Sequence, residues 1–249
     1  MLWPFGGPLT FRLAIVIIFT REGHMTLWFA SGNIHKKKEL ADILSVDILS
    51  IEILAGVENL ELKIPKDAGL SFDPEENGNS FFENALIKAK ALYRLLEKQS
   101  PGGSIHPVIA DDSGICVDAL GGRPGIHSAR YGAQASGKNI TDAEKNTLLL
   151  AELGDNPRRS ARFVCAMVLY CGHDHFYAAQ ETLEGELVRN AEAAKGRGGF
   201  GYDPILFIPE LGRTVAELSE EEKNRYSHRG KAGRVIAKIL SSALLDTNG

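Results

Sequence analysis

Residues 108–115 read VIADDSGI, an apolar strand pattern followed at once by two aspartates, a serine and a glycine. Its valine, isoleucine and alanine suit the interior of a sheet, whereas aspartate is disfavoured in strands. We therefore expect the strand to end here and to present Asp111, Asp112 and Ser113 at its carboxyl end. Gly114 would let a ligand approach the backbone. The alternative interpretation of these residues is an Asx-turn at the start of a loop.

The rest of the chain alternates short apolar runs with segments in which apolar residues recur every three or four positions. This alternation is typical of an α/β protein. The apolar runs at 26–30 (TLWFA) and 162–171 (RFVCAMVLYC) predict buried strands, and we expect two more strands at 176–179 and 182–188.

Helices are indicated by apolar stripes and by capping pairs, in which a serine or threonine precedes a glutamate by three positions. The capping pairs are Ser80 with Glu83, Thr141 with Glu144, and Ser219 with Glu222. One more helix should follow residues 31–36 and bury Leu40, Ile43 and Leu44, and another should end the chain with an apolar face formed by Ala232, Val235, Ile236, Ile239, Leu240 and Leu244.

Composition excludes several classes of function. The chain has 249 residues, 28 of them basic and 32 acidic, which gives a net charge of -4. This length suits one large core or two lobes around one sheet, and the charge gives no sign of a nucleic acid or an acidic membrane as partner. The three cysteines lack the paired spacing of zinc sites, so we expect small core residues in a reducing, cytoplasmic compartment.

The amino-terminal segment 1–24 differs from the rest. Its apolar run at 11–19 (FRLAIVIIF) is too short to span a bilayer and lacks the flanking pattern of a secretory signal. We interpret residues 1–24 as a dispensable extension and residues 25–249 as the functional domain.

The first candidate ligand loop is Ser31-Gly32-Asn33, which lies between the first strand and the first helix, with Lys36 one turn further on. Unpaired amides at a helix start, the helix dipole and a lysine together favour an anion such as phosphate. A capped helix start followed by solvated lysines is the alternative.

Two further segments could hold a ligand. Residues 196–203 (GRGGFGYD) combine exposed amides with aromatic rings, as a flat heterocycle requires, although a hairpin with core aromatics would look the same. Residues 223–229 (KNRYSHR) place Lys223, His228 and Arg229 close together, which suits phosphate and carbonyl recognition. A solvated surface helix is the alternative for this charged run.

Taken jointly and in order, five segments resemble the non-canonical purine nucleoside triphosphate pyrophosphatases, the inosine/xanthosine triphosphate diphosphatase family. The segments are SGNIHK (31–36), EENGNSFFENALIKA (75–89), ADDSGICVDALGGRPGIHSARY (110–131), GGFGYDPILFIP (198–209) and AELSEEEKNRYSHRGKA (216–232). The resemblance covers nearly the whole chain from Met25. It implies an elongated, two-lobed α/β fold around a long mixed β-sheet with flanking helices, a substrate cleft between the lobes, and a homodimer.

The resemblance also implies roles for individual residues. Asp112 would be the catalytic acid–base residue and a Mg²⁺ ligand, and Glu76 would be the second metal-linked carboxylate. For Asp111 two roles stay open, a support that holds the loop, which we favour, and a further metal contact. The triphosphate would be held by Ser31, Gly32, Asn33, Ile34, His35 and Lys36, with Lys223 also reaching the phosphates. Ser113 would touch the substrate, Phe200, Gly201, Tyr202 and Asp203 would form the base pocket, and His228 with Arg229 would recognise the purine.

These implied roles make chemical sense. Magnesium and lysines would neutralise the triphosphate before a water attacks the α-phosphorus, which yields a nucleoside monophosphate and pyrophosphate. Donors facing position 6 would accept the 6-oxo group of hypoxanthine or xanthine and reject the amine of adenine. Guanine must be rejected at position 2, by means that the sequence does not show. A nucleotide sensor without hydrolysis, and a pyrophosphatase for modified pyrimidine or methylated nucleotides, are the alternatives.

Overall fold

The computed structural model describes residues 24–55, 59–99, 107–133, 140–196 and 198–246. In this part of the chain a seven-stranded sheet has the order β2-β1-β3-β4-β5-β6-β7. The strands are β1 (His24–Phe29), β2 (Asn59–Lys63), β3 (Val108–Val117), β4 (Ser160–Gly172), β5 (His175–Leu187), β6 (Leu206–Ile208) and β7 (Arg213–Thr214).

The sheet is mixed, as predicted. Strand β1 runs parallel to both β2 and β3, whereas the remaining neighbours from β3 to β7 are antiparallel. Strands β4 and β5 form a long hairpin, and β3 pairs along β4 from the Val108–Tyr170 pair to the Val117–Ala161 pair.

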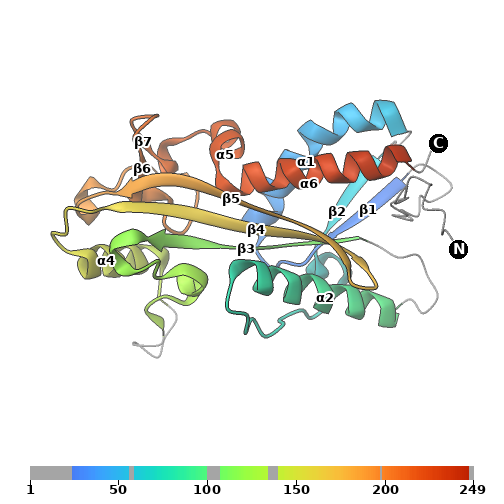
Figure 1. Cartoon of the computed structure of the whole chain (residues 1–249), viewed down its shortest axis with the longest axis horizontal. Coiled ribbons are helices and arrows are strands. Elements are labelled where there is room, and N and C mark those ends of the chain that lie inside the picture. Colours follow the sequence, from blue (N-terminus) through green and yellow to red (C-terminus); the bar gives the residue numbers. More distant parts are fainter. Residues whose placement is uncertain (1–23, 56–58, 100–106, 134–139, 197, 247–249) are drawn as a thin grey trace, which may run out of the picture.

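Helices cover both faces of this sheet (Figure 1). Helix α2 lies on one face, α1 and α6 lie together on the other, and α4 lies at the far end of the elongated molecule. The helices are α1 (Ile34–Ala55), α2 (Phe81–Gln99), α4 (Asp142–Leu153), α5 (Glu220–Tyr226) and α6 (His228–Asp246).

Separate hydrophobic clusters fill the two faces and the far end. Because side chains alternate along a strand, Ile109 packs with α1 and α6 while Val108 and Ala110 pack with α2. A further cluster joins the end of β3 to α4 and β6. The α/β fold with flanking helices is therefore confirmed, and its description as two lobes stays a prediction.

The structure corrects the predicted end of the central strand. Strand β3 continues to Val117, so Asp111, Asp112 and Ser113 lie in its middle rather than at its carboxyl end, and there is no Asx-turn. The physical reason is the unbroken pairing with β4, which supplies hydrogen bonds that outweigh the low strand preference of aspartate. Residues 176–179 and 182–188 likewise belong to one strand, β5, except for Val188, which follows its end.

Local helix signals agree closely with the structure. The capping boxes at Thr141 and Ser219 are both complete, and Ser80 accepts a hydrogen bond from the Glu83 amide. No helix within the described residues is long and apolar enough to cross a membrane. Residues 1–23 lie outside those residues, so the boundary proposed after residue 24 stays a prediction.

Candidate functional site

The site begins where β1 stops pairing with β3. The β1 register ends at the Phe29–Ile109 pair, and the Ala30 amide makes a last bond to the Ile109 carbonyl at 2.7 Å. Further along β3, the Ile115 amide donates to Ser128 Oγ at 2.9 Å. Between Ile109 and Ile115, the edge of β3 on the β1 side is therefore not paired with another strand of the described chain. This stretch carries both aspartates.

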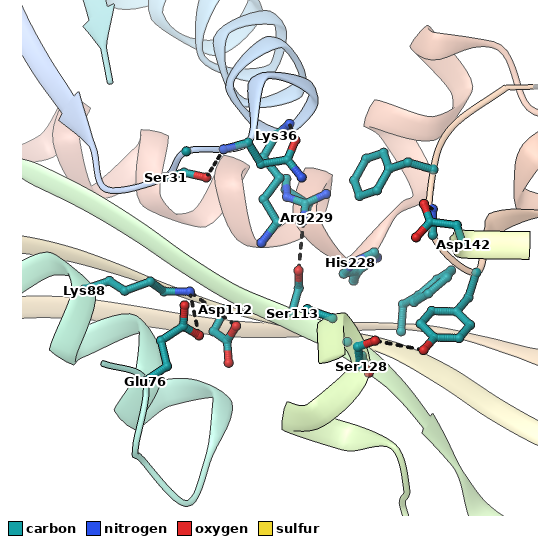
Figure 2. A pocket seen from close by; sticks show the side chains of 18 of the residues that line it. Ser31, Lys36, Glu76, Lys88, Asp112, Ser113, Ser128, Asp142, His228 and Arg229 are labelled. Atoms are coloured by element: carbon teal, nitrogen blue, oxygen red, sulfur yellow. Dashed lines mark hydrogen bonds and ion pairs between the residues drawn. The ribbon is translucent and has the colours of Figure 1, made fainter. Parts of the chain in front are cut away.

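A cavity of about 440 Å³ opens against this edge. Its lining comes from the loop after β1, from residues 72–76 before α2, from α2, from β3, from the turn at 128–129, from α4, from β4, from the glycine-rich loop, and from α5 and α6. Figure 2 shows Lys36 and Arg229 on one side of the central strand and Lys88, Glu76 and Asp112 lower in the view. Segments far apart in the sequence thus meet at one place.

The two adjacent aspartates point to opposite faces of the sheet, as strand geometry requires. Asp111 faces α1 and α6, where Lys36 and Arg229 each lie 3.1 Å from its carboxylate. Burial alone would raise the pKa of Asp111, but these cations outweigh it and hold that pKa well below its usual range. Asp111 is therefore a buried, ionised partner of two cations.

Asp112 faces α2 instead. Its carboxylate accepts hydrogen bonds from Asn84 at 3.2 Å and from Lys88 at 3.3 Å. Burial raises the pKa of Asp112 above its ordinary value, because Lys88 and Lys36 compensate only part of the lost hydration. Of the two carboxylates, Asp112 is the one suited to exchange a proton.

Lys88 connects Asp112 to Glu76. Its ammonium lies 3.3 Å from Asp112 and 3.5 Å from Glu76 Oε2, so two carboxylates converge on one cation. Burial would lower the pKa of Lys88, but Asp112, Asp111 and Glu76 outweigh it and the pKa is raised. Sequence reasoning missed Lys88 and Asn84, although a lysine beside Ala85 and Ala89 on the buried stripe of a helix was a usable signal.

The loop after β1 caps helix α1. Asn33 Oδ1 accepts hydrogen bonds from the amides of His35 and Lys36 at 2.9 and 3.2 Å, and Ser31 Oγ accepts one from the Asn33 amide. The capped helix start is therefore real, but Lys36 is not a solvated lysine, since its side chain pairs with Asp111.

The glycine-rich loop contributes both Phe200 and Tyr202 to the lining of the cavity. Asp203 fixes the loop by accepting the Phe200 amide at 2.8 Å, while Tyr202 donates to the Ser128 carbonyl at 2.8 Å and joins the core. The His35 ring stacks on Phe200 with the centroids 5.9 Å apart. The Tyr202 ring is thus anchored in the core, whereas the Phe200 ring contacts His35.

Helix α4 holds the same loop from the side. The Gly201 amide donates to Asp142 Oδ2 at 2.8 Å, and the Gly201 carbonyl accepts from Asn146 Nδ2 at 3.1 Å. Asp142 and Lys145 both line the cavity. Neither residue was predicted from the sequence.

Lys223, His228 and Arg229 are buried, although Arg225 between them is exposed, so the interpretation of the run 223–229 as a solvated helix is wrong for these three residues. Lys223 lies 2.8 Å from Asp203 and 2.7 Å from Glu39, and its ammonium is 4.5 Å from the Phe200 ring centroid. Arg229 bonds to Asp111, to Ser113 Oγ at 2.9 Å and to Glu39 at 2.5 Å. Glu39, also missed from the sequence, therefore ties α1 to both α5 and α6.

His228 is a neutral, buried imidazole. Its ring stacks on Phe163 with the centroids 4.9 Å apart. Burial, together with Arg229 and Lys223, lowers the pKa of His228 well below its ordinary value. It can therefore act as a hydrogen-bonding group rather than as a cation.

Most residues that the resemblance assigned come together at this cavity. Those that line it are Ser31, Gly32, Asn33, Lys36, Glu76, Asp112, Ser113, Phe200, Gly201, Tyr202, Asp203, Lys223, His228 and Arg229. Ile34 and His35 are not among the lining residues, and Ile34 is 59% exposed. Lys223 lies with the Phe200 loop rather than beside Lys36 and Lys88.

Comparisons with known proteins agree with one another. A sequence profile described as the Ham1 family matches residues 27–239. The dITP/XTP pyrophosphatase of Treponema denticola is 44% identical over 219 residues, which are 88% of this chain and 100% of that protein. The Ham1 protein structure from Staphylococcus aureus aligns with a TM-score of 0.70 and 33% identity, covering 87% of this chain and 98% of the other.

A second solved structure, a HAM1 protein from Coxiella burnetii, also has a TM-score of 0.70, with 35% identity over 88% of this chain and 99% of the other. The match in sequence and in fold extends over nearly all the described residues. The chain therefore belongs to the Ham1 family.

Proposed function

We propose that the protein hydrolyses non-canonical purine nucleoside triphosphates (ITP, dITP, XTP and dXTP) to the monophosphate and pyrophosphate. The observation that carries this proposal is the cavity itself, in which two carboxylates, Asp112 and Glu76, converge at one end while Phe200 offers a stacking ring at the other. The name of the Treponema denticola relative, a dITP/XTP pyrophosphatase, supports the same substrate class.

The residues present fit a magnesium ion. No cluster of three or more histidine, cysteine or acidic side chains able to hold a metal occurs in the described part of the chain. Magnesium, however, commonly takes only one or two carboxylates and completes its shell with water and phosphate oxygens. Asp112 and Glu76 already share one cation, Lys88, and would hold the ion. When bound, it would supply positive charge that stabilises the departing pyrophosphate.

The chain's own groups supply the remaining chemistry. Lys36 and Lys88 bring positive charge to the end of the cavity where the phosphates would lie, and Ser31 to Lys36 would border them. Asp112 would accept a proton from the attacking water, since its carboxylate lies at the open strand edge and is held there by Asn84 and Lys88. Asp111 keeps Lys36 and Arg229 in place.

The base would stack on Phe200, with its 6-oxo edge toward α6. Arg229 makes four hydrogen bonds to Asp111, Ser113 and Glu39 in the described structure, so one of its five N–H groups is left for an acceptor. Neutral His228 adds one more donor. Lys223, which we first assigned to the phosphates, would instead fix Phe200 and Asp203.

The decisive test is product analysis. The full chain is incubated with dITP or XTP over a range of magnesium concentrations, and the products are separated. We expect the monophosphate and pyrophosphate in equal amounts, and a loss of turnover of at least about a hundredfold in Asp112→Asn. Asp118→Asn is the matched control, because Asp118 follows the same strand and pairs with Arg162 outside the cavity.

Several outcomes would contradict the proposal. Orthophosphate without pyrophosphate would mean that a different bond is cleaved. Binding without turnover in the parent would favour a nucleotide sensor. A panel of triphosphates that ranked modified pyrimidines above inosine and xanthosine substrates by kcat/KM would change the substrate class.

We also propose a homodimer and a cytoplasmic location, which rest on the family resemblance and on cysteine usage respectively. Neither proposal enters the chemistry above.

A further inference from the structure

Lys145 is a charged cavity residue to which the proposed function gives no role. It lies near the start of α4, and its side chain is only 15% exposed. Its ammonium lies 3.2 Å from Asp142 Oδ1, which is its only hydrogen bond to another residue in the part of the chain that the structure describes. An ammonium has three N–H groups, so two remain for an acceptor in the cavity.

The position of Lys145 is fixed relative to the base loop. Asp142 accepts the Gly201 amide with one oxygen and Lys145 with the other, and Asn146 holds the Gly201 carbonyl. Asp142 and Asn146, one turn apart on α4, therefore both form hydrogen bonds to Gly201, the residue that follows Phe200. The pairing with Asp142 therefore places the Lys145 ammonium beside the loop that carries Phe200.

Lys145 reaches the cavity from α4 and Arg229 reaches it from α6. In Figure 2, His228 lies between Arg229 and Asp142, and the Asp142 carboxylate pairs with the Lys145 ammonium. Positions 2 and 6 of a purine flank N1 on one edge of the ring. A purine that turns this edge toward His228, with its 6-oxo group on the Arg229 side, would thus place position 2 on the side of α4. This step rests on the proposed function, because it assumes a purine in that orientation.

Hydrogen-bond sign then separates the three 6-oxo purines. Xanthine has an acceptor oxygen at position 2, guanine has a donor amine, and hypoxanthine has a hydrogen that neither gives nor takes. An ammonium only donates hydrogen bonds. It therefore stabilises bound xanthine, disfavours guanine and has no effect on hypoxanthine at position 2. We propose that Lys145 is the specificity-determining residue that reads position 2 of the base and discriminates xanthosine from guanosine triphosphates.

The test compares substrates within one protein. Values of kcat/KM are measured for XTP, ITP and GTP with the parent, Lys145→Met and Lys145→Arg. We expect the XTP-to-ITP ratio to fall about tenfold or more in Lys145→Met and the GTP-to-ITP ratio to rise, while Lys145→Arg keeps the XTP preference. Lys90→Met is the matched control, since Lys90 also pairs with an aspartate, Asp174, outside the cavity.

If Lys145 had a purely structural role, its replacement would lower kcat/KM for all three substrates by the same factor. Both ratios would then stay unchanged, and the proposal would be overturned. Calorimetric titration of the same proteins with XMP, IMP and GMP supplies a second readout that does not need turnover. If the parent hydrolyses none of the triphosphates, the proposed function fails. The order of the monophosphate Kd values in parent and Lys145→Met would then still decide the role of Lys145.

Discussion

Two neighbouring residues of β3, Asp111 and Asp112, have the same side chain and opposite electrostatic environments. Asp111 has a lowered pKa between Lys36 and Arg229, whereas Asp112 has a raised one because burial dominates. The environment, and not the residue type, therefore divides the pair into a structural and a reactive member. This division can be measured, because a lowered pKa and a raised pKa in the folded state change folding stability with pH in opposite directions.

We expect Asp111→Asn to destabilise the protein by about 3–5 kcal/mol, since it leaves two largely buried cations without their carboxylate. Asp112→Asn should cost much less, because it also removes the desolvation penalty of a charged group. Urea denaturation at pH 7.5 without added metal measures both changes in the free energy of unfolding.

Glu61→Asn provides the control, because Glu61 is largely exposed and makes only a local pair with Lys63. We expect this substitution to change the free energy of unfolding by no more than about 0.5 kcal/mol. If Asp112→Asn proved as damaging as Asp111→Asn, the assignment of distinct environments to the two faces of β3 would be wrong.

At the scale of elements, the junction between α5 and α6 positions the base-recognition residues. Ser227 separates the helices and accepts the Gly230 amide at 3.0 Å. Lys223 lies in the middle of α5, one turn before this junction, while His228 and Arg229 begin α6. A Cβ on Gly230 would lie 1.8 Å from the Asn224 carbonyl oxygen, which is backbone and has little freedom to move. The close approach of the helices requires glycine here.

Gly230→Ala should therefore destabilise the protein by at least about 2 kcal/mol and lower turnover, because the helices must separate. Thermal and urea unfolding measure the first effect, and dITP hydrolysis measures the second. Gly233→Ala in the same helix is the comparison: its nearest obstacle is the Ile43 side chain at 3.0 Å, so its effect should be smaller. Equal effects would contradict the role assigned to the junction.

The elements also show what could be predicted from sequence. The capping boxes at Thr141 and Ser219 were predicted correctly because their interactions lie within four residues. The continuation of β3 was not, because it depends on pairing with β4 across a long separation. A solvated surface helix stayed an alternative for Arg229 for the same reason, since its partner Glu39 lies 190 positions away. Interactions between residues close in sequence could be predicted, whereas burial by segments distant in sequence could not.

At the scale of the whole molecule, the buried charges link segments that the sheet alone does not join. Glu39 of α1 binds Lys223 of α5 and Arg229 of α6, and Asp111 of β3 binds Arg229 and Lys36. His228 lies inside this network as a neutral ring. Stability of the entire fold should therefore depend on pH through groups that lie at the site.

The direction in which His228 changes folding stability with pH follows from its lowered pKa. Below its ordinary value of 6.5 the unfolded chain binds a proton that the folded chain does not, so stability falls as the pH falls. The lowered pKa values of Asp111 and Glu39 act in the same direction, but only below their ordinary values of 3.8 and 4.5. The raised pKa values of Asp112 and Asp203 act oppositely, because the folded state takes up those protons first.

We therefore expect the free energy of unfolding, measured by urea denaturation from pH 8 to pH 5, to contain a His228 contribution that approaches about 1.4 kcal/mol per pH unit below pH 6.5. In His228→Gln that contribution should disappear, whatever the absolute stability of the variant. The readout is the difference between the two curves, in which the carboxylates common to both proteins largely cancel. Parallel curves from pH 6.5 to pH 5 would show that the imidazole takes up its proton equally well folded and unfolded, and so that His228 is not kept neutral by the buried network.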